Sequence, residues 1–192
     1  MTNISREDEY FQERDRILRE KLRKQLEEKA QAAAEHRKIA TQVGVDDEEL
    51  ARRIRALGFD GDNAGVLHLM PLVEVAWADG NLSNAERHVI LKAADARGIR
   101  PDTPAGAFLA SLLEQKPSDT VLGEILAVLK LIITHKNIKC ESVLDACLEV
   151  ANASGGFLGL TNKVSTNERQ VIESIAASFG EDAQKHVTDR LS

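Results

Sequence analysis

The chain has 192 residues, of which 43% are hydrophobic and 29% are charged, and its formal net charge is −6. This composition excludes a disordered chain, and the length allows one ordinary domain with an appendage or at most two small domains. Only 4% of the residues are aromatic, which disfavours a β-sheet and favours the packing of helix against helix.

The negative charge belongs to the larger, C-terminal part of the chain. Residues 1–40 contain ten basic and nine acidic residues, whereas residues 41–192 contain 15 basic and 22 acidic residues. An acidic body attracts cations and basic partners and repels nucleic acids and anionic membranes. We therefore expect a protein partner and no nucleic acid.

Three features of the sequence predict a cytoplasmic protein. The N-terminal region has no apolar stretch of the kind found in signal peptides. The longest apolar stretch, residues 125–133, is interrupted by Lys130 and is well short of the roughly 20 residues of a membrane span, so we expect no direct membrane insertion. Cys140 and Cys147 are seven residues apart, which on a helix separates them by about 10 Å, too far for a disulfide. Both are expected to be reduced core residues.

Residues 1–40 form the first predicted unit, a long charged helix. Residues 5–38 contain no Gly or Pro and are rich in Glu, Lys, Arg, Gln and Ala, which favour a helix. The large apolar residues make only a narrow stripe, formed by Phe11, Leu18, Leu22 and Leu26. Such a helix is a solvated arm, a weak coiled coil or a strut packed on the body, with the first two slightly favoured. A coiled coil would make the chain a homo-oligomer.

The second predicted unit, residues 46–190, is an all-α domain without a convincing strand pattern. Its helices are predicted over residues 47–57, 64–78, 83–97, 105–115, 118–136, 139–153, 166–179 and 181–190, with a Gly-rich connection over residues 154–164. Asp46 is predicted to cap the first of these helices. The second is apolar on nearly every side and therefore buried, and Pro71 should kink it or mark its start.

Two segments of this domain are similar to each other. Residues 74–80 reappear as residues 149–155, and residues 83–90 reappear as residues 165–172. The second segment of each copy begins with Ser-x-x-Glu, a capping box in which the two side chains satisfy backbone amides at the start of a helix. The sequence therefore predicts an internal two-fold repeat of helical hairpins around one core.

The first copy carries the pattern Ala78-Asp79-Gly80-x-Leu82-Ser83-x-x-Glu86. The segment Glu74–Gly98 that contains it resembles the signature of the TerB-like (tellurite resistance protein TerB) family, and the second copy at residues 149–180 lies where that family has its second one. The resemblance extends over about residues 46–190 and leaves out the N-terminal helix. It implies an all-α bundle of about seven helices, a cytoplasmic bacterial protein and a link to tellurite or other stress responses. The family is also associated with an acidic patch thought to bind a divalent cation.

The turn of the first copy is the best candidate for a metal site. Asp79, Gly80 and Glu86 are spaced like the second half of a calcium loop. The same register places the first and third ligand positions at Val75 and Trp77, whose side chains offer no oxygen. A standard EF-hand is therefore excluded.

A metal site with fewer protein ligands remains a prediction for this turn. Asp79 and Glu86 would supply carboxylates, assisted by Glu74 or Asn81, and Ca²⁺ or Mg²⁺ would be favoured over Zn²⁺. In the second copy Ser154 replaces Asp79, so a metal should prefer the first. The alternative interpretation is that Asp79 only ends one helix and Glu86 only closes its capping box.

The remaining acidic and histidine residues give weaker signals. The acidic turn at residues 60–63 is expected to be a helix cap rather than a second metal site. His68 is expected to be a core or interface residue and His88 a solvated one, and no His-Glu-x-x-His pattern is present.

No sequence motif indicates catalysis. There is no phosphate-binding glycine loop and no nucleophile elbow, and the Gly-rich residues 155–159 follow a predicted helix rather than a strand. We therefore expect a non-enzymatic TerB-like stress-response module that binds a protein partner, in a surface- or membrane-associated complex, and a divalent cation through the acidic turn. The alternative is a scaffold or oligomerisation protein whose N-terminal coiled helix is the functional part.

Overall fold

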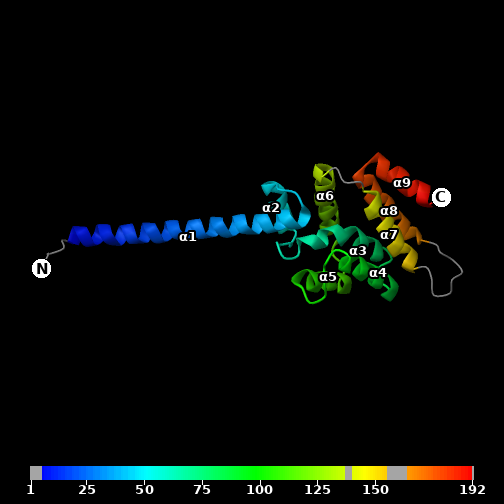
Figure 1. The fold of residues 1–192 in the computed structure, drawn as a ribbon, viewed down its shortest axis with the longest axis horizontal. Coiled ribbons are helices and arrows are strands. Elements are labelled where there is room, and N and C mark those ends of the chain that lie inside the picture. The colour runs from blue at the N-terminus through cyan, green and yellow to red at the C-terminus, as the bar shows by residue number, and fades with distance from the viewer. Residues whose placement is uncertain (1–5, 137–139, 155–163, 192) are drawn as a thin grey trace.

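The computed structural model describes residues 6–136, 140–154 and 164–191, and every regular element in them is helical (Figure 1). The elements are α1 (Arg6–Val43), α2 (Glu48–Ala56), the 3₁₀ helix η1 (Ala64–Leu69), α3 (Met70–Ala76), α4 (Asn84–Asp95), α5 (Pro104–Glu114), α6 (Asp119–Lys136), α7 (Glu141–Ser154), α8 (Thr166–Phe179) and α9 (Glu181–Leu191). The predicted all-α fold is confirmed. Eight α-helices follow α1 in the described part, one more than the seven that the family resemblance implied. The predicted Gly-rich connection lies outside the described residues, apart from its two ends.

The helix α1 projects from the body and is anchored to it only at its C-terminal end (Figure 1). All side chains of residues 9–34 are exposed, whereas Ile39 and Val43 are buried in the core. The helix ends later than the predicted 5–38 because residues Ile39 to Val43 continue it. It ends at Gly44, whose φ of 72° is the left-handed conformation that glycine adopts without strain. The same helix is thus a strut over its last turns and an arm over the rest.

Polar contacts hold the anchored end of α1 to the residues around η1 and to α6. Glu35 accepts a hydrogen bond from the backbone amide of Gly61, and Lys38 pairs with Asp62 at 3.1 Å. On the other side, Lys136 at the end of α6 donates to the carbonyl oxygen of Val43 at 3.4 Å. Lys136 thereby gives the carbonyl oxygen of Val43 at the end of α1 a donor, and Glu35 gives the Gly61 amide an acceptor.

The predicted helix over residues 64–78 is divided in the structure. Its first part is η1, and Pro71 occupies the first turn of α3. Proline fits that position because the amide that it lacks has no acceptor within the helix there. Pro71 therefore marks the start of a helix, which is the second of the two predicted alternatives. The cap of α2 is Asp47, which accepts from the Leu50 amide at 2.7 Å, and not the predicted Asp46.

The two copies of the sequence repeat form two packed hairpins, α3–α4 and α7–α8. The helix α7 packs against both α3 and α4, and α8 packs against α3. Val75 and Val150 occupy equivalent positions and are fully buried, as are Ile90 and Ile172. Both copies therefore contribute to one core, as the repeat predicts. No helix in the described part of the chain combines the length and apolar character needed to cross a membrane.

Candidate functional site

Both predicted capping boxes are confirmed with nearly identical geometry. In the first copy, the Ser83 amide donates to Glu86 Oε2 at 2.7 Å and the Glu86 amide donates to Ser83 Oγ at 3.2 Å. In the second copy, the corresponding distances between Ser165 and Glu168 are 2.7 and 3.1 Å. Each box starts the second helix of its hairpin, α4 or α8.

The two capping glutamates are buried and influence each other. Glu86 is 3% exposed and Glu168 is 1% exposed, and both stand out in a core that is otherwise almost wholly apolar. Burial raises the pKa of Glu86, the hydrogen bonds with Ser83 oppose this shift, and the charge of Glu168 adds to it. The pseudo-symmetric packing of the hairpins therefore brings two carboxyl groups from distant parts of the chain within electrostatic range. Site prediction from the first copy alone missed Glu168, although the repeat contained the signal.

Asp79 extends this acidic group to the surface. Its charge also raises the pKa of Glu86, while Asp79 and Asn81 themselves are exposed on the turn between α3 and α4. Gly80 allows the turn to be tight, because its φ of 78° would strain any residue with a side chain. The exposed Asp79 and the buried Glu168 thus both act electrostatically on the buried carboxyl group of Glu86.

Glu74 has a different environment from the other three predicted ligands. It lies on α3, and its atom Oε2 is buried and has no hydrogen-bond partner among the described residues. Burial is the main reason that its pKa rises to about 7. The charge of Asp119 adds to the shift, and Lys116 opposes it. Glu74 therefore interacts with the start of α6, and Asp79 and Glu86 are not among the charges that shift its pKa.

The acidic turn lies on a rigid support, because side chains of the same segment hold the end of α5. Trp77 Nε1 donates to the carbonyl oxygen of Leu112 at 3.0 Å, and Arg87 Nη2 donates to that of Leu113 at 2.7 Å. These carbonyls belong to the last turn of α5, where no intrahelical donor remains. The segment from Trp77 to Arg87 is thereby fixed at both of its ends.

The residues of the first copy fit a hard cation only with the help of solvent. In the described part of the chain, no three His, Cys, Asp or Glu side chains are already arranged to hold a metal ion. Asp79 and Asn81 offer exposed side-chain oxygens, and Glu86 has one oxygen committed to the Ser83 amide. Mg²⁺ and Ca²⁺ commonly keep water ligands and accept such sites.

The second acidic cluster, at residues 60–63, is a turn with local partners. Asp60 Oδ1 accepts from the amides of Asp62 and Asn63 at 2.9 and 3.0 Å, and Asn63 Oδ1 accepts from the Asp60 amide at 2.9 Å. Asp62 also pairs with Lys38. The oxygens of this cluster build the turn and attach α1. The predicted helix cap is wrong, because Asn63 at the N-cap position of η1 makes no side-chain capping hydrogen bond.

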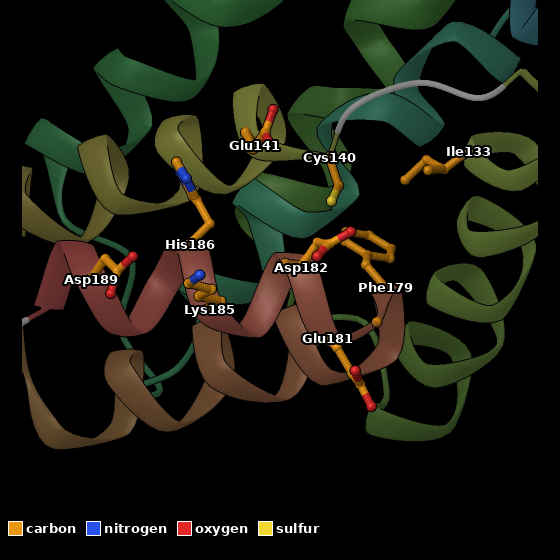
Figure 2. A pocket seen from close by; sticks show the side chains of 11 residues that line it. Ile133, Cys140, Glu141, Phe179, Glu181, Asp182, Lys185, His186 and Asp189 are labelled. Atoms are coloured by element: carbon orange, nitrogen blue, oxygen red, sulfur yellow. The ribbon is translucent and has the colours of Figure 1, made fainter.

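A polar cavity of about 740 Å³ is lined by residues of α6, α7, α8 and α9 (Figure 2). It is lined by Ile133, Cys140, Glu141, Phe179, Gly180, Glu181, Asp182, Ala183, Lys185, His186 and Asp189. Figure 2 shows Cys140, Phe179 and Asp182 facing the same space. Burial raises the pKa of the Cys140 thiol, and Glu141 and Asp182 add to the shift. A thiol so placed is a poor nucleophile.

The cysteines and histidines occupy mostly structural positions. Cys147 is fully buried, as predicted, but Cys140 is only partly buried and lies just before α7 rather than in the core. His68 is partly buried, and burial lowers its pKa. The charges of Lys136 and Arg97 add to this shift, and a hydrogen bond with the backbone of Gln42 on α1 opposes it. His68 is therefore an interface residue, and His88 is exposed. Both histidine predictions are confirmed.

Comparison with known protein families places part of the chain in a family. The family of tellurite resistance protein TerB matches residues 3–107, which include α1, the whole first copy of the repeat and the beginning of α5. This range begins earlier and ends earlier than the 46–190 of the resemblance seen in the sequence. No curated protein and no solved structure matches the chain. Because the match extends over more than half of the chain, the protein belongs to the tellurite resistance protein TerB family.

Proposed function

We propose that this protein is a non-enzymatic TerB-type module of a bacterial stress response, which binds a divalent cation at the acidic turn of its first repeat and a protein partner through its acidic body. Asp79 and Glu86 are the principal cation ligands in this proposal, with Asn81 assisting. Glu168 adds negative charge from the second repeat.

The electrostatic coupling of Asp79, Glu86 and Glu168 carries the proposal. Folding buries the carboxyl group of Glu86, which raises its pKa. The charges of Glu168 and Asp79 add smaller contributions in the same direction. A divalent cation at the exposed Asp79 would reduce this repulsion. A ligand role for the turn would account for the acidic neighbours of Glu86, which the capping box itself does not require.

The ligand types favour Ca²⁺ or Mg²⁺ over Zn²⁺. The turn offers carboxylate and amide oxygens only, and hard cations prefer oxygen whereas structural Zn²⁺ sites use Cys and His. His88 is the nearest histidine in sequence to Glu86, and it is exposed on α4. Glu74 has the least support among the predicted ligands, because its charged neighbours are Asp119 and Lys116.

A non-enzymatic role in the cytoplasm agrees with the thiols and with the charge. Burial raises the pKa values of both Cys140 and Cys147, which disfavours the reactive thiolate form. Residues 41–192 carry seven more acidic than basic residues. A basic surface on a protein partner, including a component of a membrane-associated complex, would be attracted to this body.

A second function, oligomerisation or scaffolding through α1, is favoured by a separate observation. The exposed part of α1 presents large apolar side chains to solvent, among them Leu18 at 63% and Leu26 at 59% exposure. A helix that serves only as a spacer between two parts of a protein would not need exposed apolar side chains.

Calorimetric titration of metal-free, full-length protein with Ca²⁺, Mg²⁺, Mn²⁺ and Zn²⁺ tests the cation site. We expect binding heat with Ca²⁺ or Mg²⁺ that Asp79→Asn and Glu86→Gln remove. Glutamine at position 86 can still close the capping box, so this variant should keep its fold. Glu74→Gln in the same titration shows whether Glu74 contributes.

Asp95→Asn is the matched control, because Asp95 is an exposed acidic residue at the far end of α4. It should bind the cation as the unmodified protein does. A bound cation should also raise the melting temperature, since it stabilises only the folded state. If no ion at millimolar concentration changes the melting temperature or gives heat, the cation proposal is wrong.

A further inference from the structure

The exposed part of α1 carries an apolar stripe that no described residue covers. Phe11, Leu18, Leu22 and Leu26 are between 53% and 63% exposed. Their spacings of seven, four and four residues place them on one face of a helix. Tyr10 and Ile17 are also exposed but fall about 100° to the side of this face.

The charges of the same stretch are separated along the helix. Residues 7–15 contain five acidic residues and one basic residue, and residues 16–24 contain five basic residues and one acidic residue. Two consecutive segments of about two and a half turns thus carry opposite net charges. Any helix that pairs with α1 along the stripe is favoured if it places basic residues against residues 7–15 and acidic residues against residues 16–24.

We propose that α1 pairs with α1 of a second copy of this chain in antiparallel orientation, with Phe11 of each copy opposite Leu22 of the other. The two Phe11–Leu22 contacts form the apolar centre of the pair, whereas Leu18 lies opposite Asp15 and Leu26 opposite Glu7. Antiparallel helices pair positions of type a with positions of type d, and Leu22 and Phe11 occupy such positions in one heptad frame. In this register, residues 7–15 face residues 18–26 of the second copy. The acidic segment of each helix then lies against the basic segment of the other.

The charges argue against the parallel arrangement. In a parallel pair, each acidic segment would face its own acidic counterpart and each basic segment its basic counterpart. The two bodies, each with seven more acidic than basic residues, would also lie side by side. The antiparallel register separates residue 35 of one copy from residue 35 of the other by about 56 Å along the helix axis, well beyond the screening length of about 8 Å at physiological ionic strength.

The length of the exposed stretch also fits this register. Residue 6 of the second copy would lie opposite Glu27, and the body begins to cover α1 only at Glu35. The pairing therefore lies on exposed helix and leaves the anchored turns unchanged. It specifies the partner and orientation of the second function proposed above, and it does not depend on the cation site.

Sedimentation equilibrium of the full-length protein tests the pairing. We expect the apparent mass to double over concentrations up to about 0.1 mM, since a two-helix overlap of this length is a weak interface. Leu22→Gln should keep the protein monomeric. Ile17→Gln is the matched control, because it makes a comparable change on the side of the helix and should still dimerise. A protein that stays monomeric at every concentration overturns the proposal, whatever the calorimetric titration shows.

A spin-label distance tests the orientation. Gln31 is exposed and lies outside the proposed overlap, so a label can be attached to Gln31→Cys in a Cys140→Ser background. Cys147 is fully buried and should not react. The antiparallel pair places the two labels about 44 Å apart along the axis, whereas a parallel pair places the helix axes only about 10 Å apart there. A distance of about 40–50 Å supports the proposal, and a distance under about 25 Å overturns it.

Discussion

Glu74 is ionisable, partly shielded from water and short of hydrogen-bond donors. Its pKa in the folded protein rises to about 7, mainly because of burial. The folded state therefore holds this proton more tightly than the unfolded state does. The resulting contribution to stability is full below pH about 4.5, the ordinary value, and is lost as the pH rises through about 7.

We predict that Glu74→Gln makes the protein more stable at pH 8 and has almost no effect at pH 5. The gain should be about 1–2 kcal/mol, less than the pKa shift alone implies, because part of the side chain remains in contact with solvent. Urea unfolding followed by circular dichroism at the two pH values measures the difference.

The second repeat supplies the control for this prediction. Glu149 occupies the position equivalent to Glu74 but is exposed, so Glu149→Gln should change stability little at either pH. A Glu74→Gln variant that is destabilised at pH 8 would show that the carboxylate has a stabilising partner, such as a bound cation.

The sequence identified the acidic residues of the turn but not their environments. Asp79 and Glu86 could be chosen because the Asp-Gly turn and the capping box are local patterns, each complete within a few residues. Glu168 could not be assigned to the same group without knowing how the hairpins pack. The charges that act on Glu74 belong to Lys116 and Asp119, more than 40 residues away in the sequence, and no local pattern reports them.

Among the elements, α5 and α9 are held at their C-terminal ends by equivalent arginines. Arg87, which follows the capping glutamate of α4, donates to the carbonyl oxygen of Leu113 in α5. Arg169, which follows the capping glutamate of α8, donates to that of Leu191 in α9 at 3.5 Å. In each copy, the arginine that follows the capping glutamate therefore holds the end of the next helix in the chain.

We predict that Trp77→Phe and Arg87→Gln each lower the free energy of unfolding by about 1 kcal/mol, since each leaves a carbonyl of α5 without its donor. The double variant should lose less than the sum of the two, because both donors hold the same helix end. Chemical unfolding followed by circular dichroism is the suitable measurement, because Trp77 is the only tryptophan.

Arg97→Gln is the matched control for these variants. Arg97 is exposed, lies just beyond the end of α4 and donates to the carbonyl oxygen of Ala93 in that helix, so its replacement should change stability by less than about 0.5 kcal/mol. Equal losses at Arg87 and Arg97 would contradict a special role for the end of α5.

Helix type and approximate position were predictable for most elements, whereas their ends depended on tertiary contacts. The starts of α4 and α8 follow from Ser83 and Ser165, whose caps are local. The 3₁₀ helix η1 was not predicted, since its residues Ala64–Leu69 are as apolar as those of an α-helix. The predicted end of α1 is too early because the sequence does not show that the body covers Ile39 and Val43. Their burial in the core stabilises the last turns of the helix.

For the whole molecule, the division between arm and body falls inside α1 rather than at its end. Glu35, Lys38, Ile39 and Val43 contact the body, and residues 9–34 are exposed. The family match also includes α1, because it begins at residue 3. The last turns of α1 are therefore part of the folded domain, and only the preceding turns are free to bind a partner.

Two deletions separate these two parts of α1. Removal of residues 1–34 should change the free energy of unfolding of the body by less than about 1 kcal/mol, because none of the described side chains before Glu35 is buried. Removal of residues 1–40 should cost at least about 2–4 kcal/mol, because it takes the fully buried Ile39 out of the core. Urea unfolding of both truncated proteins measures the two losses, and neither protein should dimerise. Equal losses from the two deletions would mean that Ile39 does not contribute to the core as its burial implies. A large loss from the shorter deletion would mean that the exposed turns stabilise the body through contacts that a single chain does not contain, and a second copy paired along α1 would be the first candidate to supply them.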